Sequence, residues 1–302
     1  MDWITGIQNA INFIEEHIIE QLSMEEIAAQ SFSSTFHFQR VFSILCGYTV
    51  GEYIRNRRLS LAGAELANTH AKVIDVACQY GYETPESFAK AFLKFHGITP
   101  SQARREGAIL KSFSRVAVKI SLEGGSIMDY RVEQKKELVL YGYKRHFTGD
   151  PRNRDLQDHN FYCETRLKQA VLQYMAHDVD TTYNVFSDFS GDGYNCHIAS
   201  YFSEGEGLTD LAEQMGTEVA DWFEKIVIPA GTYLICETEK CEYPTNQADE
   251  LYRQAVTQWL PSCGYELAEG PEVEIIHWPY KEGNDALNHS RYLELWLPIV
   301  KK

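Results

Sequence analysis

The spacing of apolar residues divides the chain into a helical first part and a strand-rich second part. Isoleucines recur at positions 4, 7, 11, 14 and 18, and steps of three or four residues place them on one face of a helix. Segments such as 138–147 and 292–298 instead alternate apolar and polar residues, which is the period of a β-strand with one buried face. The pattern predicts two domains, an all-α domain followed by an α+β domain.

The helical part repeats one pattern, a short helix, a turn and a longer helix, at residues 22–42 and 73–92. The first copy begins with Ser23 and Glu26, three residues apart, which form a capping box. Gly81 supplies the turn of the second copy. We therefore expect two helix-turn-helix units, joined by a long helix, each with its second helix placed to enter a DNA major groove.

In each unit, apolar residues mark the inner face, and other positions near the amino end of the second helix face outward. The residues expected to pack are Phe38, Val41, Phe42 and Leu45 in the first unit, and Ile74, Val76, Ala77, Tyr80, Phe88, Phe92 and Phe95 in the second. The residues expected to face DNA are Ser34, Thr35, Phe36, Gln39, Arg40, Thr84, Pro85, Glu86, Ser87 and Lys90. Glutamine and arginine can form paired hydrogen bonds with adenine and guanine.

The chain has a net charge of −15, but the acidity lies in the second domain. Residues 1–126 carry 12 Lys and Arg and 13 Asp and Glu, so the remaining residues have a net charge of −14. The long helix, expected over 53–66, carries Arg55, Arg57 and Arg58. Such a cluster can neutralise DNA phosphates locally, although the total charge of the domain is near zero.

Residues 5–106 closely resemble the DNA-binding domain of AraC/XylS transcription regulators. The resemblance is carried by the stretch Ile74–Arg104, with its Gly-Tyr-Glu-Thr and Gly-Ile-Thr-Pro pieces. The segments His37–Phe42 and Gly51–Arg55 are most similar to the branch of MarA, SoxS and Rob. The resemblance implies that a monomer inserts two recognition helices into successive major-groove segments on one face of the duplex.

The same resemblance implies base contacts for Phe36, Gln39 and Arg40 in the third helix, and for Pro85, Glu86 and Lys90 in the sixth helix. Three positions depart from that branch, which has tryptophan at position 36 and a Gln-Gln pair at positions 85 and 86. Among base edges a glutamate can accept only from cytosine, and it repels phosphate. We therefore expect the third helix to supply most of the specificity and the sixth helix mainly to anchor phosphates.

Residues 109–126 are typical of a linker, because they mix Arg, Lys and Ser with Gly124 and Gly125. The domains are then expected at 1–108 and 127–302. In the second domain, strands are expected at about 138–147, 183–189, 196–202, 223–229, 231–237, 273–278 and 292–298, with helices at about 158–176 and 246–260. This order predicts two β-α-β-β pseudo-repeats around a ligand cleft, with one curved sheet backed by two helices.

The final strand carries the most informative side chains of this domain. Its leucines at 293, 295 and 297 point to one face, and Tyr292, Glu294 and Trp296 point to the other. A glutamate in the middle of a strand is costly to bury unless it meets a cation or a hydrogen-bond donor. The alternative is a solvated outer face with Glu294 at the surface, which is common for one face of a sheet.

Residues 127–302 resemble GyrI-like effector-binding domains, in the segments Ile228–Tyr233, Trp259–Tyr265 and Leu293–Ile299. The resemblance implies a cleft between two repeats, lined by aromatic residues, with a glutamate at its base that attracts lipophilic cations. Glu294 matches that glutamate. From strand alternation and sequence neighbourhood, the expected walls are Tyr292, Trp296, Tyr143, Tyr201, Trp222, Trp259, Trp278 and Tyr280.

These features predict a transcription regulator that binds double-stranded DNA and senses a small hydrophobic, cationic effector, with RNA polymerase as a further partner. The family resemblance favours an activator. One alternative is a hydrolase in which Glu294, with a raised pKa, acts as a general base. Another is an acidic domain that mimics DNA and inhibits a DNA-binding protein. The fused DNA reader argues against the hydrolase, since detoxification requires none.

The remaining patterns point to a cytoplasmic protein without a metal or cofactor. No Ser/His/Asp or Cys/His arrangement, phosphate-binding loop or metal-ligand spacing is present, so no catalytic residue is predicted. The seven cysteines form no C-x-x-C pair, which is typical of reduced thiols. The sequence shows neither a signal peptide nor an apolar run of the ~20 residues that a membrane span needs.

Overall fold

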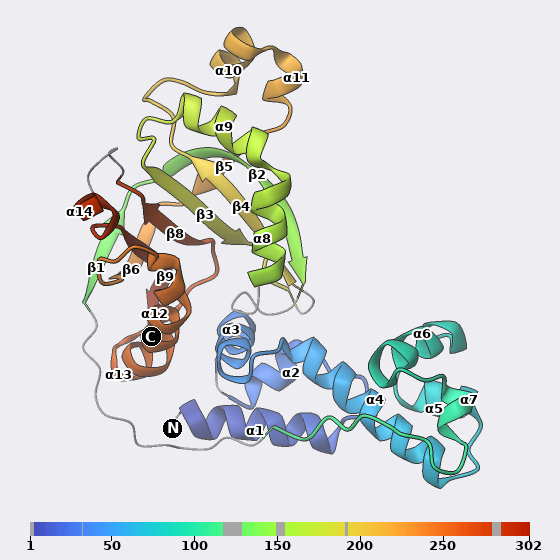
Figure 1. The fold of residues 1–302 in the computed structure, drawn as a ribbon. Helices are drawn as coiled ribbons and strands as arrows, with labels where there is room; N and C mark the ends of the chain where they lie inside the picture. Colours follow the sequence, from blue (N-terminus) through green and yellow to red (C-terminus); the bar gives the residue numbers. More distant parts are fainter. Residues whose placement is uncertain (1–2, 32, 117–128, 149–154, 191–192, 280–284) are drawn as a thin grey trace. The chain divides into compact units, whose positions relative to one another are not determined.

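The computed structural model describes residues 3–31, 33–116, 129–148, 155–190, 193–279 and 285–302 (Figure 1). The chain forms two compact units, Met1–Leu122 and Glu123–Lys302, here called unit 1 and unit 2. Of the predicted linker, residues 117–126 lie outside the described residues. Among the helices of the described ranges, none has the length and apolarity that crossing a membrane requires.

Unit 1 is built of helices joined by short turns. They are α1 (Trp3–Glu16), α2 (Met24–Ala29), α3 (Thr35–Cys46), α4 (Val50–Asn68), α5 (Val73–Gln79), α6 (Pro85–His96) and α7 (Pro100–Ala103). The predicted capping box is confirmed: Ser23 accepts from the Glu26 amide, and Glu26 accepts from the Ser23 amide. The helix pairs α2–α3 and α5–α6 are the two helix-turn-helix units, and α4 joins them.

Aromatic residues fill the cores of both helix pairs. In the first, Phe38 and Phe42 are buried, and the Phe42 ring packs against Tyr53 of α4 with the ring centroids 5.8 Å apart. In the second, Phe88 and Phe92 are fully buried. These positions were predicted from spacing, and burying such rings contributes roughly 1.5–3 kcal/mol each.

Two predicted core positions are wrong. Leu45 is 40% exposed and Ile74 is 51% exposed. Ile44 is buried in the last turn of α3 instead. In α5 the half-buried Val73 lies on the same face as the buried Val76 and Ala77, and Ile74 lies about 100° around the helix from Val73.

The turn between α5 and α6 depends on Gly81, as the sequence predicts. Its φ is +80°, a left-handed conformation that side chains rarely adopt. A Cβ there would also lie 2.7 Å from Nη1 of Arg58. Glycine is therefore favoured by the backbone conformation, and any side chain there would also displace the end of the Arg58 side chain.

Two arginines of α4 connect this helix to α1 and to the segments that follow α1 and α7. Arg57 pairs with Glu15 of α1 at 2.7 Å and donates to the carbonyl of Phe113 at 2.6 Å. Both side chains of this ion pair are mostly buried, at 14% and 11% exposure. Arg58 donates to the carbonyls of Ile18 and Glu20, which follow α1. Carbonyls at the end of a helix have no helical partner, so these bonds satisfy them.

The chain continues along unit 1 after α7. The amide of Phe113 donates to Ser60 at 3.0 Å, and its ring contacts the rings of Tyr48 and Tyr53. The amide of Val116 donates to the Tyr53 hydroxyl at 3.3 Å. Residues 109–116, the start of the predicted linker, thus include several contacts with α4 and its surroundings.

Unit 2 contains one antiparallel sheet in the order β1-β6-β9-β8-β3-β4-β2-β5, with β7 paired to β9. The strands are β1 (Tyr130–Lys135), β2 (Leu138–Thr148), β3 (Thr181–Ser187), β4 (Gly193–Ser200), β5 (Glu224–Ile228), β6 (Gly231–Glu237), β7 (Tyr265–Leu267), β8 (Glu272–His277) and β9 (Tyr292–Lys301). The helical segments are α8 (Asp155–Glu164), α9 (Arg166–Met175), α10 (Leu208–Met215), α11 (Thr217–Ala220), η1 (Pro244–Gln247), α12 (Ala248–Gln254), η2 (Ala255–Trp259), α13 (Leu260–Ser262) and α14 (Asp285–Asn288).

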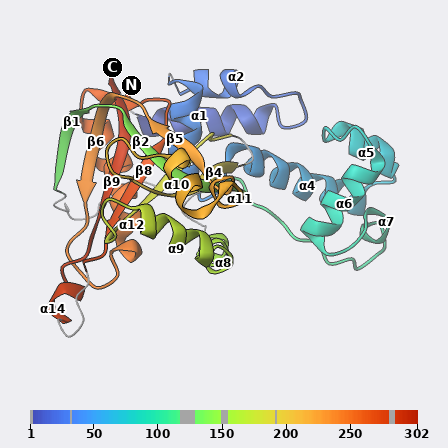
Figure 2. The same cartoon turned by 90° about the horizontal axis from the view of Figure 1, so that it is seen from above.

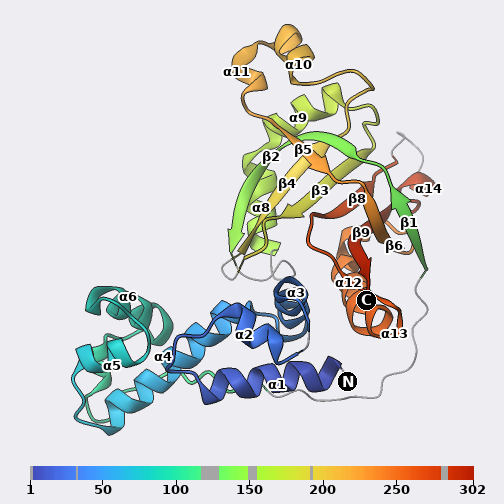
Figure 3. The same ribbon diagram turned by 180° about the vertical axis from the view of Figure 1, so that it is seen from behind.

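The sheet must curl, because Pro229 and Ala230 alone connect β5 to β6. In a flat sheet the six strand spacings between β6 and β5 would span about 29 Å. Two intervening residues reach about 11 Å at most. The two ends of the sheet are therefore brought together, and the curvature is visible in Figure 1 and, from behind, in Figure 3.

Curling gives the sheet an inner and an outer face. The inner face carries an apolar cluster contributed by strands from both ends of the sheet, formed by Leu140, Val185, Ala199, Ile226, Ile228, Tyr233, Ile235, Val273 and Ile275. On the outer face, α8 and α9 cover a second cluster that includes Tyr143, Phe147 and Phe161. Figure 2 shows α8, α9 and α12 on the same side of the sheet.

Most predicted strands of unit 2 lie where the alternation placed them, but β1 and β7 were missed. The helix predicted at 158–176 is divided in two at Thr165. The strand order is symmetric: β1 corresponds to β5, β2 to β6, β3 to β8 and β4 to β9. When the members of each pair are exchanged, the order is the same read from the other end of the sheet. The internal repeat itself stays a prediction.

We expect Arg57→Ala to destabilise unit 1 by about 3–5 kcal/mol, because it leaves the mostly buried Glu15 carboxylate without its cation. Hydrogen exchange of the α1 and α4 amides in the full chain would report this loss for unit 1 separately. Arg55→Ala, an exposed arginine of the same helix, is the control. Equal exchange in the two variants would contradict the structural role of Arg57.

Candidate functional site

The outward face of α3 begins at Ser34, which caps the helix by accepting from the His37 amide at 3.2 Å. Ser34 is exposed, and Thr35, Phe36 and Gln39 are half-buried. These residues lie within the first turns of the helix, which is the part of a recognition helix that meets base edges.

Arg40 departs from the sequence prediction. It is only 4% exposed in the folded chain, so the expectation that it points outward is wrong. A buried guanidinium needs a partner, and Arg40 has an interaction partner within the chain. Its role as a base-contacting residue stays a prediction.

The amino end of α6 is open to solvent. Thr84 caps this helix by accepting from the Ser87 amide at 3.2 Å, and Pro85 occupies the first helical position, where an amide would have no helical partner. Glu86, Ser87 and Lys90 are exposed as well. The exposed set thus combines hydroxyl groups, one anion and one cation.

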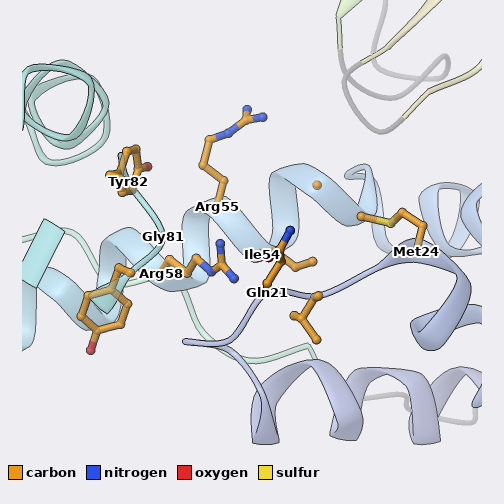
Figure 4. Close-up of a pocket in the computed structure, with 10 residues that line it drawn as sticks. Gln21, Met24, Ile54, Arg55, Arg58, Gly81 and Tyr82 are labelled. Carbon is orange, nitrogen blue, oxygen red and sulfur yellow. The ribbon is translucent and has the colours of Figure 1, made fainter. Parts of the chain in front are cut away.

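The arginine cluster of α4 separates into one exposed residue and two structural ones. Figure 4 shows Arg55 projecting away from α4, whereas Arg58 lies between Ile54 and Gly81. These residues line a hollow of about 330 Å³ between the two helix-turn-helix units, together with Gln21 and others. The prediction that all three arginines neutralise phosphates is wrong for Arg57 and Arg58, whose donors serve Glu15 and backbone carbonyls.

In unit 2, Glu294 lies on the inner face of β9. It stands opposite Ile275 of β8 and Glu237 of β6, and directly opposed residues of an antiparallel pair share a face. Tyr292, Glu294 and Trp296 are all half-buried, and the leucines between them are buried. The alternation predicted for this strand is confirmed.

The Glu294 carboxylate has three donors. His277 Nε2 lies 3.2 Å from Oε1, and the Trp296 indole donates to Oε2 at 3.0 Å. The Arg131 guanidinium donates to Oε2 at 2.8 Å. The Glu294 side chain is 13% exposed, so the predicted alternative of a freely solvated glutamate is wrong.

Arg131 connects three carboxylates across neighbouring strands. Besides Glu294, it pairs with Glu237 of β6 and, at 2.7 Å, with Glu133 of its own strand. Lys135 pairs with Glu133 and lies over the Trp296 ring, 4.5 Å from its centroid. The residues Arg131, Glu133, Lys135, Glu237, His277, Glu294 and Trp296 are called the Glu294 cluster below.

The electrostatic surroundings keep Glu294 ionised. Burial alone raises the pKa of this carboxyl, but the hydrogen bonds from His277 and Trp296 and the charge of Arg131 outweigh it. The result is a pKa lowered to about 2. Because an ionised carboxylate only accepts, His277 Nε2 carries the proton of their hydrogen bond.

The predicted aromatic walls do not all meet at Glu294. Tyr292 and Trp296 adjoin it on β9, and Tyr201 packs against the inner cluster. Tyr143 and Trp222 instead belong to the outer-face cluster. The prediction that these two wall the same site is wrong, because their side chains lie on the opposite face of the sheet.

Trp259 and Trp278, two further predicted walls, pack against other residues. Trp259 packs on Tyr130 and Tyr265, with ring centroids 5.1 and 6.1 Å away. Trp278 lines a pocket described below, and the Arg291 guanidinium lies 5.5 Å from its ring centroid. Tyr280 lies outside the described residues.

A pocket of about 500 Å³ lies between α8 and the segment of η1 and α12, over β3 and β8. Its lining combines Tyr162 and Trp278 with the carboxylates of Asp158, Asp249 and Glu274. Glu274 is only 6% exposed. This outer pocket is a second place in unit 2 where aromatic rings and acidic groups come together.

Sequence reasoning missed Arg131 and assigned His277 no role. Arg131 follows Tyr130 and precedes Val132, and this short alternation was not recognised as a strand. His277 was one of several scattered histidines, and its ring stacks on Tyr292 with centroids 4.3 Å apart. The signal that could have found Arg131 is the pattern Arg131, Glu133, Lys135 at every second position.

Comparison with known proteins accounts for both units. Residues 27–106 match a helix-turn-helix domain family, and residues 133–299 match the family of integron-associated effector binding proteins. Over 98 residues the chain is 41% identical to the transcriptional activator AarP of Providencia stuartii, covering 32% of this chain and 73% of AarP. Over 98 residues it is 39% identical to SoxS of Salmonella typhimurium, covering 32% of this chain and 92% of SoxS. The chain belongs to the integron-associated effector binding protein family, and its unit 1 to the AraC-type regulators that include AarP and SoxS.

Further similarities are to one more regulator and to two solved structures. The chain is 42% identical over 99 residues to the regulator YbfP of Bacillus subtilis, covering 33% of this chain and about a third (34%) of YbfP. The solved structure of SAV2435 bound to tetraphenylphosphonium has 16% identity and a TM-score of 0.41, covering 57% of this chain and 94% of that one. The DNA-binding domain of AdpA with its target DNA has 25% identity and a TM-score of 0.31, covering 33% of this chain and 89% of that one.

We expect Arg55→Ala to weaken binding to all DNA sequences by a similar factor and to reduce the slope of log affinity against log salt by about 1, as for the loss of one phosphate contact. A duplex selected from a random pool would serve as the specific ligand. Arg253→Ala, which removes one surface charge from unit 2, is the control. A salt slope equal to that of the control would reject the contact.

The lowered pKa of Glu294 predicts a pH-dependent stability. Its ionised form stabilises the fold above the ordinary pKa of 4.5, and this contribution is lost as the pH falls from about 4.5 towards 2. Glu294→Gln should therefore cost about 1–3 kcal/mol near neutral pH and progressively less below pH ~4.5. Urea unfolding followed by tryptophan fluorescence would measure the difference. A difference that does not change with pH would contradict ionisation of Glu294 as its source.

Proposed function

We propose that the chain is a sequence-specific DNA-binding transcription regulator whose unit 2 binds a small hydrophobic cation at Glu294. The observation that carries the effector assignment is a carboxylate held ionised on the inner face of the sheet and bordered by aromatic rings. The DNA assignment rests on two helix-turn-helix units in a domain of the AraC type.

The reading of DNA is divided between α3 and α6. The exposed or half-buried residues at the start of α3 include Gln39, which can pair with an adenine edge. Glu86 at the start of α6 repels phosphate, and Lys90 attracts it. We assign base selection mainly to α3, anchoring to α6, and a phosphate contact to Arg55 on the connecting helix.

The chemistry of the Glu294 cluster favours a cation. Its three carboxylates exceed its two fixed positive charges, Arg131 and Lys135. Trp296 and Tyr292, which are half-buried, offer ring faces, and such faces attract cations and apolar groups together. A ligand that combines positive charge with apolar surface satisfies both parts of the site.

Regulation requires that the effector bind the DNA-competent and DNA-incompetent states with different affinities. The family favours an activator, which would also contact RNA polymerase. The two β-α-β-β halves suggested by the strand order would provide the frame that encloses the effector.

The hydrolase alternative is disfavoured by the charge state of Glu294. A general base works best with a pKa near the operating pH, whereas the pKa of Glu294 is lowered to about 2. The raised pKa expected for a hydrolase is therefore wrong. A carboxylate of such low basicity suits the binding of a cation better than the removal of a proton.

Titration of the full chain with tetraphenylphosphonium, a lipophilic cation, tests the effector assignment through tryptophan fluorescence. Saturable quenching is expected, because Trp296 adjoins Glu294. Glu294→Gln should abolish the quenching, whereas Glu274→Gln should preserve it. Glu274 is the matched control, since it lies on the neighbouring strand but lines the outer pocket. Loss of quenching in Glu274→Gln alone would show that the cation binds in the outer pocket instead. Consumption of the cation, detected by mass spectrometry, would support the hydrolase alternative.

A further inference from the structure

The Glu294 carboxylate already has a cation of its own chain. Arg131 reaches from β1 across β6 to Glu294 on β9, and its guanidinium lies 2.8 Å from Oε2. The charge that a cationic effector would supply is therefore present before any effector binds. We propose that Arg131 is an internal counter-ion which the effector must displace from Glu294, and that it sets the affinity and selectivity of the site; this rests on the proposed effector function.

The two partners differ in their access to solvent. The Arg131 side chain is 39% exposed and the Glu294 side chain is 13% exposed. The guanidinium can therefore regain water by a change of its own side-chain conformation. The carboxylate is fixed by the backbone of β9, which is paired on both sides by β6 and β8. The arginine is thus the partner that can leave.

Leaving Glu294 does not leave the arginine unpaired. The same guanidinium also contacts Glu237, and its Nε lies 2.7 Å from Glu133. Both of these carboxylates are more exposed than Glu294, at 38% of their side chains. Arg131 can retain these two partners while it gives up the third. A partly exposed ion pair contributes little to stability, so giving up this contact has a small free-energy cost.

The remaining contacts of Glu294 persist when Arg131 moves away. His277 and Trp296 still donate to the carboxylate, at 3.2 and 3.0 Å, and keep it ionised and oriented. Its negative charge is then available to another cation. An ion that binds mainly by donating hydrogen bonds would compete poorly with Arg131, because His277 and Trp296 already donate to the carboxylate. A small hydrated ion would also have to lose its bound water.

The structure therefore assigns the replacement ligand to one chemical class. The competing cation needs a delocalised charge, which is weakly hydrated, and an apolar body that contacts the ring of Trp296. For such a ligand, the burial of apolar surface supplies the favourable free energy that Arg131 obtains from its hydrogen bonds to Glu294. Metal ions and simple ammonium ions offer no such surface, so Arg131 excludes them.

Tetraphenylphosphonium titrations of the full-length wild type, Arg131→Gln and Arg131→Lys test the proposal. Removing the counter-ion in Arg131→Gln should tighten binding by about fivefold, which corresponds to ~1 kcal/mol and is the upper end for a partly exposed ion pair. Arg131→Lys keeps the charge but loses the forked contacts, so its affinity should lie between those of Arg131→Gln and the wild type. Circular dichroism and thermal unfolding would establish that each variant is folded.

Arg145→Gln is the matched control for the loss of one positive charge. Arg145 also lies on a strand, pairs with a glutamate at 2.7 Å and has 37% of its side chain exposed, but it projects from β2 next to Phe161 of the outer face. Its affinity for tetraphenylphosphonium should stay within about twofold of the wild type, as for a distant charge. Equal tightening in Arg131→Gln and Arg145→Gln would show a general charge effect and overturn the proposal.

The failure of this inference can be distinguished from failure of the proposed function. If Glu294→Gln abolishes binding but Arg131→Gln binds no more tightly than the wild type, the effector site stands and Arg131 is not its competitor. If Glu294→Gln binds as well as the wild type, the assignment of the effector to Glu294 fails, and this inference fails with it. Weaker binding by a folded Arg131→Gln protein would also overturn it, since Arg131 would then assist the ligand.

Discussion

Pro229 and Ala230, the only residues between β5 and β6, impose the constraint on which unit 2 depends. They connect strands that lie six positions apart in the sheet, so the sheet has to curl and acquires an inner face. The curl brings residues from both ends, such as Ile228 and Ile235, into one apolar cluster. It also gives Glu294 a partly enclosed setting, in which a carboxylate needs charged and hydrogen-bonding partners. The Glu294 cluster follows from this geometry.

The sequence was sufficient for features that depend on local spacing. The cap at Ser23, the turn at Gly81 and the alternation around Glu294 follow from two, three or four neighbouring residues. Local physics decides these features, because helix ends need acceptors and strands expose alternate residues. The class of each unit, and much of the secondary structure, was therefore predictable without knowledge of the tertiary contacts.

Features that depend on distant partners were not predictable in this way. Arg55, Arg57 and Arg58 are equivalent in sequence, yet Arg57 meets Glu15, 42 residues away, and Arg58 meets carbonyls at the end of α1. The aromatic residues of unit 2 likewise gave no indication of which face of the sheet each would occupy. Tyr143 and Trp296 both lie on alternating strands, but only the strand register assigns them to opposite faces. Arg131 is the extreme case, since its contact with Glu294 spans 163 residues.

Each unit contains a largely buried glutamate that is neutralised by an arginine, and the two pairs differ in how easily the arginine could be released. In unit 1, Arg57 pairs with Glu15 in a mostly buried setting and also binds a backbone carbonyl, so its release would be costly. In unit 2, Arg131 pairs with Glu294 from a more exposed position and has two further carboxylates nearby. The first arrangement fixes a scaffold, and the second can exchange one partner at low cost. The proposed effector site needs the second kind, because Arg131 would then occupy the carboxylate until a cation with a higher affinity for the site displaces it.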